Sequence, residues 1–346
     1  MTTATRPSPD AATPRRPAGS RAAGLVVSGV VLLALCVCSL AFGVRSVSIE
    51  DVLAASGGRV DTVSQAAVSA RIPRTVLAVL IGAALALSGA AMQAITRNPL
   101  ADPGILGVSG GAALAVVVGL AFFGLAAPYA LITVAIVGAA VAAVFVYAVG
   151  SLGRGGATPL KLALAGAAIS AAFASVTSAV LLPRADVMEA FRFWQIGGVG
   201  GATWDRIGIV APVLAVGALI VFLTARGMDS LALGDDMAAG LGEDVARTRL
   251  VASTGAVVLC GAATAVAGPI AFVGLVLPHL CRLLVGPDQR WVLPFTAALG
   301  AALLVAADVV GRLIARPEEI EVGIVTALIG APVFIWIVRK QRVREL

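Results

Sequence analysis

Apolar residues along this chain gather into blocks that short polar connections separate. The blocks are about 18 to 23 residues long, which is the length of helix that crosses the hydrocarbon core of a bilayer. They predict ten spans, at residues 24–44, 74–95, 104–125, 128–150, 160–182, 207–224, 248–267, 269–285, 292–314 and 322–339. The eighth is the weakest, because it is short and contains Pro278. The pattern therefore predicts an all-α polytopic membrane protein with ten transmembrane helices.

The composition supports this interpretation. Of the 346 residues, 59% are hydrophobic and 13% are charged, whereas soluble domains carry about 25% charged residues. Most of the 25 lysines and arginines fall in alternate connections, on the side that holds the N-terminus. Because cytoplasmic loops are enriched in these residues, we expect both termini in the cytoplasm.

The N-terminal segment differs from the rest of the chain. Residues 1–21 are rich in Pro, Thr, Ala and Arg and hold almost no large apolar residue, so they are expected to form a disordered cytoplasmic tail. Residues 22–346 are expected to form one transmembrane domain. A signal peptide cleaved near Ala41 is the alternative, but an apolar run of about 20 residues exceeds the usual apolar core of such a peptide.

The predicted spans are almost empty of ionisable residues, which a proton- or sodium-coupled carrier usually keeps there. Asp308 is the one carboxylate well inside an apolar block. Arg312 follows one helical turn later, so these two side chains are expected to neutralise each other. An ion-coupled carrier is disfavoured on this ground, and it stays open as the alternative.

The chain also lacks the groups that catalysis or metal binding needs. No span offers facing carboxylates or a nucleophile beside a base, and the single histidine, His279, has too few partners for a zinc site. We expect no catalytic residue, no metal and no cofactor. Neither of the two lysines follows a glycine, so a phosphate-binding P-loop is missing. If ATP drives transport, another polypeptide must hydrolyse it.

The longest inner connection, residues 225–249, is too polar to insert into the bilayer. Short helices on the cytoplasmic face are expected here, with Leu231, Leu233, Met237 and Leu241 as an apolar stripe for a partner protein. The alternative is a helix that rests on lipid headgroups. Such helices are usually basic on their polar face, whereas this segment carries five carboxylates.

Two helix-breaking stretches nearly repeat one another. NPLADPGILGVSGG at residues 98–111 is echoed by GPIAFVGLVLP at residues 268–278, on the opposite side of the membrane by the predicted topology. Upstream, residues 88–91 are echoed by residues 260–263. Echoes on opposite sides of the membrane are typical of an inverted internal repeat. Chance similarity between Gly- and Ala-rich helices is the alternative.

Seven motifs along the chain can be compared with a known family. They are RIPR from Arg71, SGAAMQAITRNPLADPGILGVSGGA from Ser88, FWQIGG from Phe193, LALGDDMAAGLG from Leu231, GPIAFVGLVLPHLCR from Gly268, ADVVGR from Ala307 and VGIVTALIGAPVFIWIV from Val322. With these motifs the chain resembles the ABC permeases that import ferric siderophores, haem and cobalamin, over nearly its whole length beyond residue 24. The resemblance implies a bacterial cell-membrane subunit that works as a dimer. Two cytoplasmic ATPase subunits and one external substrate-binding protein would be its partners.

The resemblance also implies roles for individual residues. In the segment 225–249, the residues expected to couple the permease to its ATPase are Gly234, Asp235, Ala238, Leu241 and Gly242. Glu243 departs from the family, which often has an apolar residue there, and this difference bears on the choice of ATPase partner.

The inner gate is expected at Thr158 and Pro159, between the fourth and fifth spans. An ordinary turn is the alternative, because short Gly and Pro loops are common connectors.

The resemblance also implies that Arg71, Arg74 and Arg312 dock the binding protein. Arg71 and Arg74 lie on the outer side and at the start of a helix, where neither the loop-charge rule nor the helix dipole favours a cation. Side chains that reach to lipid headgroups are the alternative. The family often has Glu-Leu-Pro where this chain has Glu319-Ile320-Glu321, and this difference bears on the contact with the binding protein. A ferric siderophore is the expected substrate, with haem and cobalamin as alternatives, and a homodimer and a heterodimer both stay open.

Overall fold

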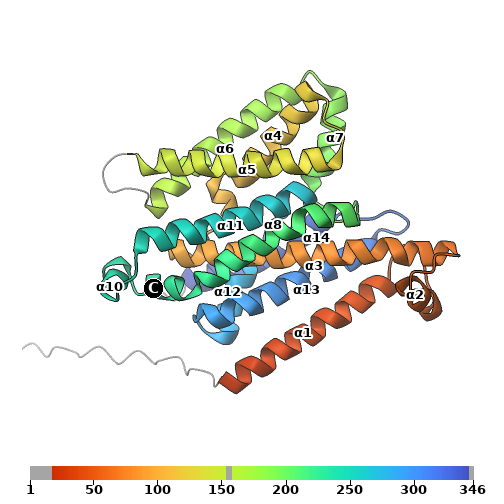
Figure 1. Ribbon diagram of the computed structural model, residues 1–346, viewed down its shortest axis with the longest axis horizontal. Helices are drawn as coiled ribbons and strands as arrows, with labels where there is room; N and C mark the ends of the chain where they lie inside the picture. Colours follow the sequence, from red (N-terminus) through yellow and green to blue (C-terminus); the bar gives the residue numbers. More distant parts are fainter. Residues whose placement is uncertain (1–17, 153–157, 343–346) are drawn as a thin grey trace, which may run out of the picture.

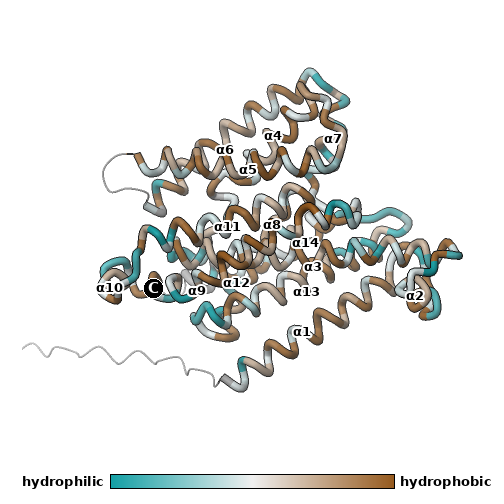
Figure 2. The backbone as a smooth tube through the Cα atoms, in the orientation of Figure 1, coloured by the Kyte–Doolittle hydropathy of each residue, from teal (hydrophilic) through white to brown (hydrophobic). Residues whose placement is uncertain are grey.

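The computed structural model describes residues 18–152 and 158–342 of the chain (Figure 1). Within these ranges every regular element is helical, so the all-α prediction is confirmed for this part of the chain. Most of the predicted N-terminal tail lies outside the described residues. Helices run along the long axis of the molecule, with hydrophilic residues gathered mainly at its two ends (Figure 2).

Each predicted span has a helix in the structure. These are α1 (Ala18–Ala41), α3 (Val63–Thr96), α4 (Val108–Phe123), α5 (Pro128–Ser151), α6 (Pro159–Leu181), α8 (Trp204–Leu223), α11 (Val245–Ala267), α12 (Val273–Val285), α13 (Gln289–Ile314) and α14 (Val322–Arg342). Short helices connect them: α2 (Ile49–Ser56), the 3₁₀ helix η1 (Pro103–Leu106), α7 (Ala185–Ile196), α9 (Ala225–Leu231) and α10 (Asp235–Gly240).

Length separates the long helices into two groups. Among the described residues, seven helices are long and apolar enough to cross a membrane, and α4, α12 and the apolar part of α14 are shorter. The 13 residues of α12 extend about 20 Å, less than the roughly 30 Å of a hydrocarbon core. The predicted eighth span at 269–285 is only partly helical. Residues 268–272 are irregular, and Phe272 has a φ of 69°.

Three helices form the centre of the molecule. Burial was compared over an apolar stretch of 18 residues in each helix. The buried share of that stretch is 78% in α3, 72% in α11 and 67% in α13, whereas it is only 11% in α1. Helix α3 packs against α11, α12 and α13, and α4, α5 and α6 form a separate group that contacts the centre through α11 (Figure 1). The outer helices keep apolar surface exposed, as helices that face lipid do.

Helix α3 is longer than its predicted span at 74–95 and begins at Val63. Thr62 accepts the backbone N–H of Gln65, and the Gln65 side chain accepts the backbone N–H of Thr62, which forms a capping box. Apolarity alone does not mark this start, because the capped first part of the helix is more polar than the rest. With 34 residues, α3 extends about 51 Å from one end of the bundle to the other.

The two near-repeated stretches line one cavity of about 310 Å³. Asp102, Pro103 and Ser109 come from the first stretch, and residues 269–272 come from the second. Both stretches precede a short helix, α4 in one case and α12 in the other. Irregular backbone is tolerated at membrane depth where protein buries it or where it lines a cavity, and this explains why an apolar chain breaks its helices here.

Close backbone contacts hold the first residues of these short helices. Gly89 of α3 lies against Gly274 of α12, and a methyl group on Gly89 would overlap the Gly274 carbonyl. Nearby, the Gln93 amide donates to the carbonyl oxygens of Gly274 and Leu275 at 3.3 and 3.0 Å. At the first stretch, Gly261 of α11 faces Val108, the first residue of α4. Helices α3 and α11 thus each place a glycine against the start of a short helix.

Replacement of Gly89 by alanine should destabilise the protein, because the new methyl group must push α12 away from α3. Overpacking of this kind typically costs about 1–3 kcal/mol. Gly208→Ala in α8 is the matched control, since nothing lies within 4 Å of a methyl group at that position, and it should be neutral or slightly stabilising. Thermal denaturation of the purified protein in detergent measures both; equal melting temperatures for the two variants would contradict the packing described above.

Candidate functional site

Residues 225–244, which we call the coupling segment after their predicted role, lie at the end of the bundle where α10 lies (Figure 1). Helix α9 is anchored by Met228 and Leu231, both fully buried, and α10 is anchored by Ala238, which is also fully buried. Leu233 and Leu241 are 53% and 68% exposed. The segment therefore presents an apolar face that nothing in the described chain covers.

The structure distributes the predicted coupling residues between this face and the backbone turns. Leu241 lies on the exposed face, whereas Ala238 packs inward and cannot touch a partner directly. Gly234 and Gly242 have φ values of 104° and 86°, which favour glycine because a side chain is strained there. In the predicted apolar stripe, Leu231 is also buried. The sequence does not reveal which face of such a short helix points inward, because glycines interrupt the segment before an apolar pattern can repeat.

Two carboxylates fasten the coupling segment to the membrane helices. Asp229 accepts the backbone N–H of Gln289, the first residue of α13, at 2.9 Å. Burial raises the pKa of the Asp229 carboxyl, while this hydrogen bond acts in the opposite direction. Asp235 forms ion pairs with Arg97 and Arg249 at 3.0 and 2.8 Å. Sequence reasoning identified Asp235 but neither of its partners, because no spacing rule links positions this far apart.

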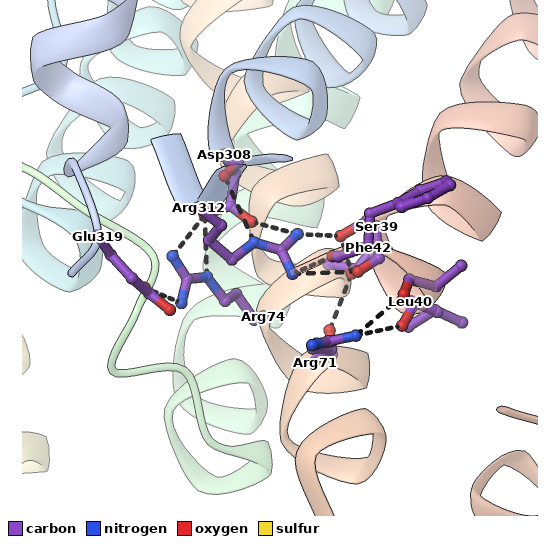
Figure 3. A network of polar contacts seen from close by, with 10 residues as sticks. Ser39, Leu40, Phe42, Arg71, Arg74, Asp308, Arg312 and Glu319 are labelled. Atoms are coloured by element: carbon purple, nitrogen blue, oxygen red, sulfur yellow. Dashed lines mark hydrogen bonds and ion pairs between the residues drawn. The ribbon is translucent and has the colours of Figure 1, made fainter. Parts of the chain in front are cut away.

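At the opposite end of the bundle, the three predicted docking arginines come together (Figure 3). Arg71 donates to the carbonyl oxygens of Leu40 and Arg45 at 2.9 and 2.7 Å. Arg312 donates to those of Ser39 and Phe42, both at 3.1 Å. These carbonyls lie at and just beyond the end of α1, where a helix leaves its last acceptors unpaired and where its dipole favours cations. Arg71 and Arg312 thus satisfy the C-terminal end of α1.

Asp308 joins two of these arginines. Its Oδ1 accepts from the Nε of Arg74 at 2.9 Å, and its Oδ2 faces the Nη2 of Arg312 at 2.9 Å. The predicted pair between Asp308 and Arg312 is therefore confirmed, and Arg74 is a second partner that the sequence did not suggest. Arg74 also forms an ion pair with Glu319 at 2.6 Å, and the Glu319 side chain is 38% exposed. Asp308 and Arg312 are each only 2% exposed.

The environment of these arginines explains their unfavourable position in sequence. These side chains do not extend into solvent or to lipid headgroups. Instead they bind the end of α1 and Asp308 inside the bundle. Of the three, Arg74 is the most exposed, with a side chain that is 11% accessible. Ser39 was missed as a member of this network, although its hydroxyl accepts from Arg312 at 2.7 Å, because a serine in an apolar block gives no signal of its own.

The predicted gate lies beside a part of the chain outside the described residues, 153–157. Thr158 precedes α6 and its hydroxyl accepts the backbone N–H of Lys161 at 3.4 Å, so it caps the helix. Pro159 is the first residue of that helix, a position that proline favours. Thr158 and Pro159 thus have a local role at the helix start. Among the described residues, no group of three His, Cys, Asp or Glu side chains could hold a metal ion.

Long apolar helices packed against shorter ones, charged residues gathered near the two ends (Figure 2) and an exposed apolar segment at one end are typical of a polytopic transport permease. Residues 31–340 match the FecCD transport family, and the chain belongs to that family. Permeases of this class serve ABC importers of iron chelates, haem and cobalamin, and separate subunits hydrolyse the ATP. The family resemblance inferred from the motifs is thereby confirmed, and the chain is a multi-pass protein of a bacterial inner membrane.

Named relatives and a solved structure agree with this assignment. The ferric enterobactin permease FepD of Escherichia coli is 44% identical over 92% of this chain and 94% of its own length. The iron(3+)-hydroxamate permease FhuB of Bacillus subtilis is 46% identical over 79% of this chain and 71% of its own. A metal-chelate type ABC transporter solved in an inward-facing conformation has a TM-score of 0.81 and 30% identity, covering 92% of this chain and 99% of that chain. Other matching relatives are named for iron dicitrate, hemin and cobalamin.

Replacement of Asp308 by alanine should destabilise the protein strongly. It leaves Arg312, and part of Arg74, as unpaired buried cations, and breaking a buried pair in this way typically costs about 3–5 kcal/mol. Glu319→Ala removes an exposed partner, and such a pair is worth about 0.2–1 kcal/mol. Glu318→Ala, at an exposed neighbour for which the described chain shows no ion pair, is the control. Thermal denaturation in detergent ranks the three; a melting temperature for Asp308→Ala as high as that of the control would refute the central role of Asp308.

Proposed function

We propose that this chain is the permease subunit of an ATP-driven importer of ferric siderophores, which it receives from an external binding protein. The observation that carries the proposal is the 44% identity to the ferric enterobactin permease over 92% of the chain. Haem and cobalamin are the alternative cargoes, because relatives named for hemin and cobalamin also match. An ion-coupled carrier is the remaining alternative, and the described spans offer little for it beyond the neutralised pair of Asp308 and Arg312.

The functional unit we propose has two permease subunits, identical or different, with two ATPase subunits at one end and one binding protein at the other. The exposed residues Leu233, Met237 and Leu241 support an ATPase contact at the coupling segment. Both termini would lie on that same, cytoplasmic side. In support, the start of α1, the coupling segment and the end of α14 lie at one end of the bundle (Figure 1).

Ten membrane crossings and an inverted internal repeat complete the proposed architecture. The seven long helices would cross fully, and α4, α12 and α14 would supply the remaining crossings together with the irregular backbone before or after them. The repeat is supported by the shared cavity and by the way in which Gly89 and Gly261 each face the start of a short helix.

The inner gate is proposed at Thr158 and Pro159, where two copies of this loop would meet at the dimer axis. Thr158 is partly accessible in the single chain, which leaves room for such a contact. Cysteines at position 158 should crosslink between the two subunits in at least one nucleotide state. If no state yields a crosslink, the segment is an ordinary connector.

For the binding protein, we propose a dock at the outer end of α3 and α13, with Arg74 as its main contact. Arg71 and Arg312 would support this surface from inside the bundle, because both side chains already donate hydrogen bonds to the end of α1. Arg74 is the exception, since its partner Glu319 is exposed and an acidic residue of the binding protein could compete for the guanidinium.

Deletion of this chain should abolish uptake of ferric siderophores in the source bacterium. Uptake of radiolabelled iron bound to enterobactin-type, hydroxamate and citrate chelators measures this, with haem and cobalamin uptake followed in parallel. Intact siderophore uptake combined with failed cobalamin or haem uptake would replace the proposed cargo. Uptake that survives depletion of ATP but stops when an ionophore removes the ion gradients would replace the mechanism.

One charge change at each end should separate the two docks. Leu241→Asp should weaken the affinity for the ATPase about tenfold or more, because a buried leucine is worth about 1.5–3 kcal/mol. Arg74→Glu should weaken binding-protein affinity at low salt and leave ATPase affinity unchanged. Arg59→Glu, at an exposed outer arginine away from this network, is the control for charge alone. Binding-protein affinity that falls equally in the Arg59 and Arg74 variants would rule out a specific dock at Arg74.

A further inference from the structure

One carboxylate at the cytoplasmic end of the bundle joins three elements of the chain. The Oδ1 atom of Asp235, the first residue of α10, pairs with the Nη2 of Arg97 at 3.0 Å and with the Nη2 of Arg249 at 2.8 Å. Arg97 follows the last residue of α3, and Arg249 lies in the first turns of α11. The Nε of Arg249 also donates to the carbonyl oxygen of Ile95 in the last turn of α3, at 3.4 Å. We call Arg97, Asp235 and Arg249 the inner clamp.

The backbone at Arg97 gives independent evidence that its side chain is needed. Arg97 has φ 51° and ψ 33°, the left-handed conformation at the end of α3. Glycine is the residue that fits this position without a steric penalty, and a residue with a side chain costs about 1–2 kcal/mol there. Apart from Phe272, no other non-glycine residue in the described ranges has a positive φ. Strain of this kind is a reason to look for a function of the side chain, and the ion pair with Asp235 supplies one.

The exposure of the inner clamp argues against a role in stability alone. The side chains of Arg97 and Asp235 are 42% and 43% accessible, and that of Arg249 is 22% accessible. Pairs this exposed are screened by water and contribute little to folding. What the clamp fixes is geometry, because three charged groups on three elements leave α10 little freedom to move relative to α3 and α11.

We propose that Arg97 and Arg249 are positioning residues that hold the coupling segment to α3 and α11 through Asp235. In this arrangement the Asp235 carboxylate faces the permease, and the exposed Leu233, Met237 and Leu241 are left to face the ATPase. A displacement of α10 then moves the ends of two central helices with it. The inference rests on the proposed ATPase dock at the coupling segment, and it changes the role of Asp235 from a contact with the ATPase to an internal anchor.

A distance measurement within the permease tests the inner clamp directly. Nitroxide labels on cysteines at positions 100 and 239, both exposed, report the separation between the α3 end and α10 once the four native cysteines are replaced. In the assembled permease–ATPase complex without nucleotide, we expect a narrow distance distribution. Asp235→Asn and Arg249→Met should broaden it, Arg249→Lys should restore it, and Asp236→Asn, at an exposed neighbour for which the described chain shows no ion pair, should leave it unchanged.

Arg97→Gly separates positioning from structure. This variant relieves the left-handed strain, so its melting temperature should equal or exceed that of the unchanged protein, yet its distance distribution should broaden as in Asp235→Asn. The non-hydrolysable analogue AMP-PNP should shift the mean distance in Asp235→Asn but not in the unchanged protein, where α10 and α3 move together. A distribution that stays narrow in Asp235→Asn and Arg97→Gly would overturn the clamp.

ATPase affinity distinguishes this inference from the function on which it rests. Asp235→Asn should bind the ATPase within about threefold of the unchanged protein, because it alters only half-exposed internal pairs, whereas Leu241→Asp should bind it far more weakly. Equal losses for Asp235→Asn and Leu241→Asp would mean that Asp235 contacts the ATPase, and the clamp would be refuted while the dock stands. Unchanged affinity in Leu241→Asp would refute the dock, and the label distances without nucleotide would still decide the clamp.

Discussion

The packing of α3 against its neighbours is the constraint on which the rest of this structure depends. Lipid tails are as apolar as leucine, so helices in a bilayer associate through close contact and hydrogen bonds rather than through the hydrophobic effect. Here Gly82 meets the backbone of α13 at Gly300, and Gly89 meets that of α12 at Gly274. Any side chain at these crossings would separate the helices. Because α3 runs the full length of the bundle, these contacts also determine where its two charged ends lie.

Those two ends repeat one arrangement with different surroundings. At the outer end Asp308 is shared by Arg74 of α3 and Arg312 of α13, and at the inner end Asp235 is shared by Arg97 beside α3 and Arg249 of α11. The outer carboxylate is 2% accessible, whereas the inner one is 43% accessible. A buried pair cannot exchange partners cheaply, since an unpaired ion costs several kcal/mol. The outer network therefore acts as a fixed joint, whereas the inner clamp lies at an exposed end of the bundle, where a partner protein can reach it.

The sequence predicted the helices well and the charged contacts poorly, for a physical reason. Block length and apolarity identify a buried helix, because the bilayer imposes one length on every crossing, and the pair of Asp308 with Arg312 follows from helical spacing. Contacts of Arg71 and Arg312 with the end of α1 join positions about 30 and about 270 residues apart, which no local pattern encodes. For α12 the sequence indicated a short, weak span and a helix-breaking stretch at its start, but not the residue at which the helix begins, since the irregular residues 268–272 are as apolar as a helix would be.

A single rigid helix between the two proposed docking surfaces would have a thermodynamic consequence. If closure of the ATPase displaces α10 and the inner clamp passes that displacement to α3, the outer surface around Arg74 must change as well. Coupling between two binding events is reciprocal, so binding-protein docking would then favour ATPase closure by the same free energy. The described spans offer few charged groups that could discriminate among chelates. In the proposed assembly, selectivity would enter through which binding protein fits the outer end, and the permease would contribute the mechanical link.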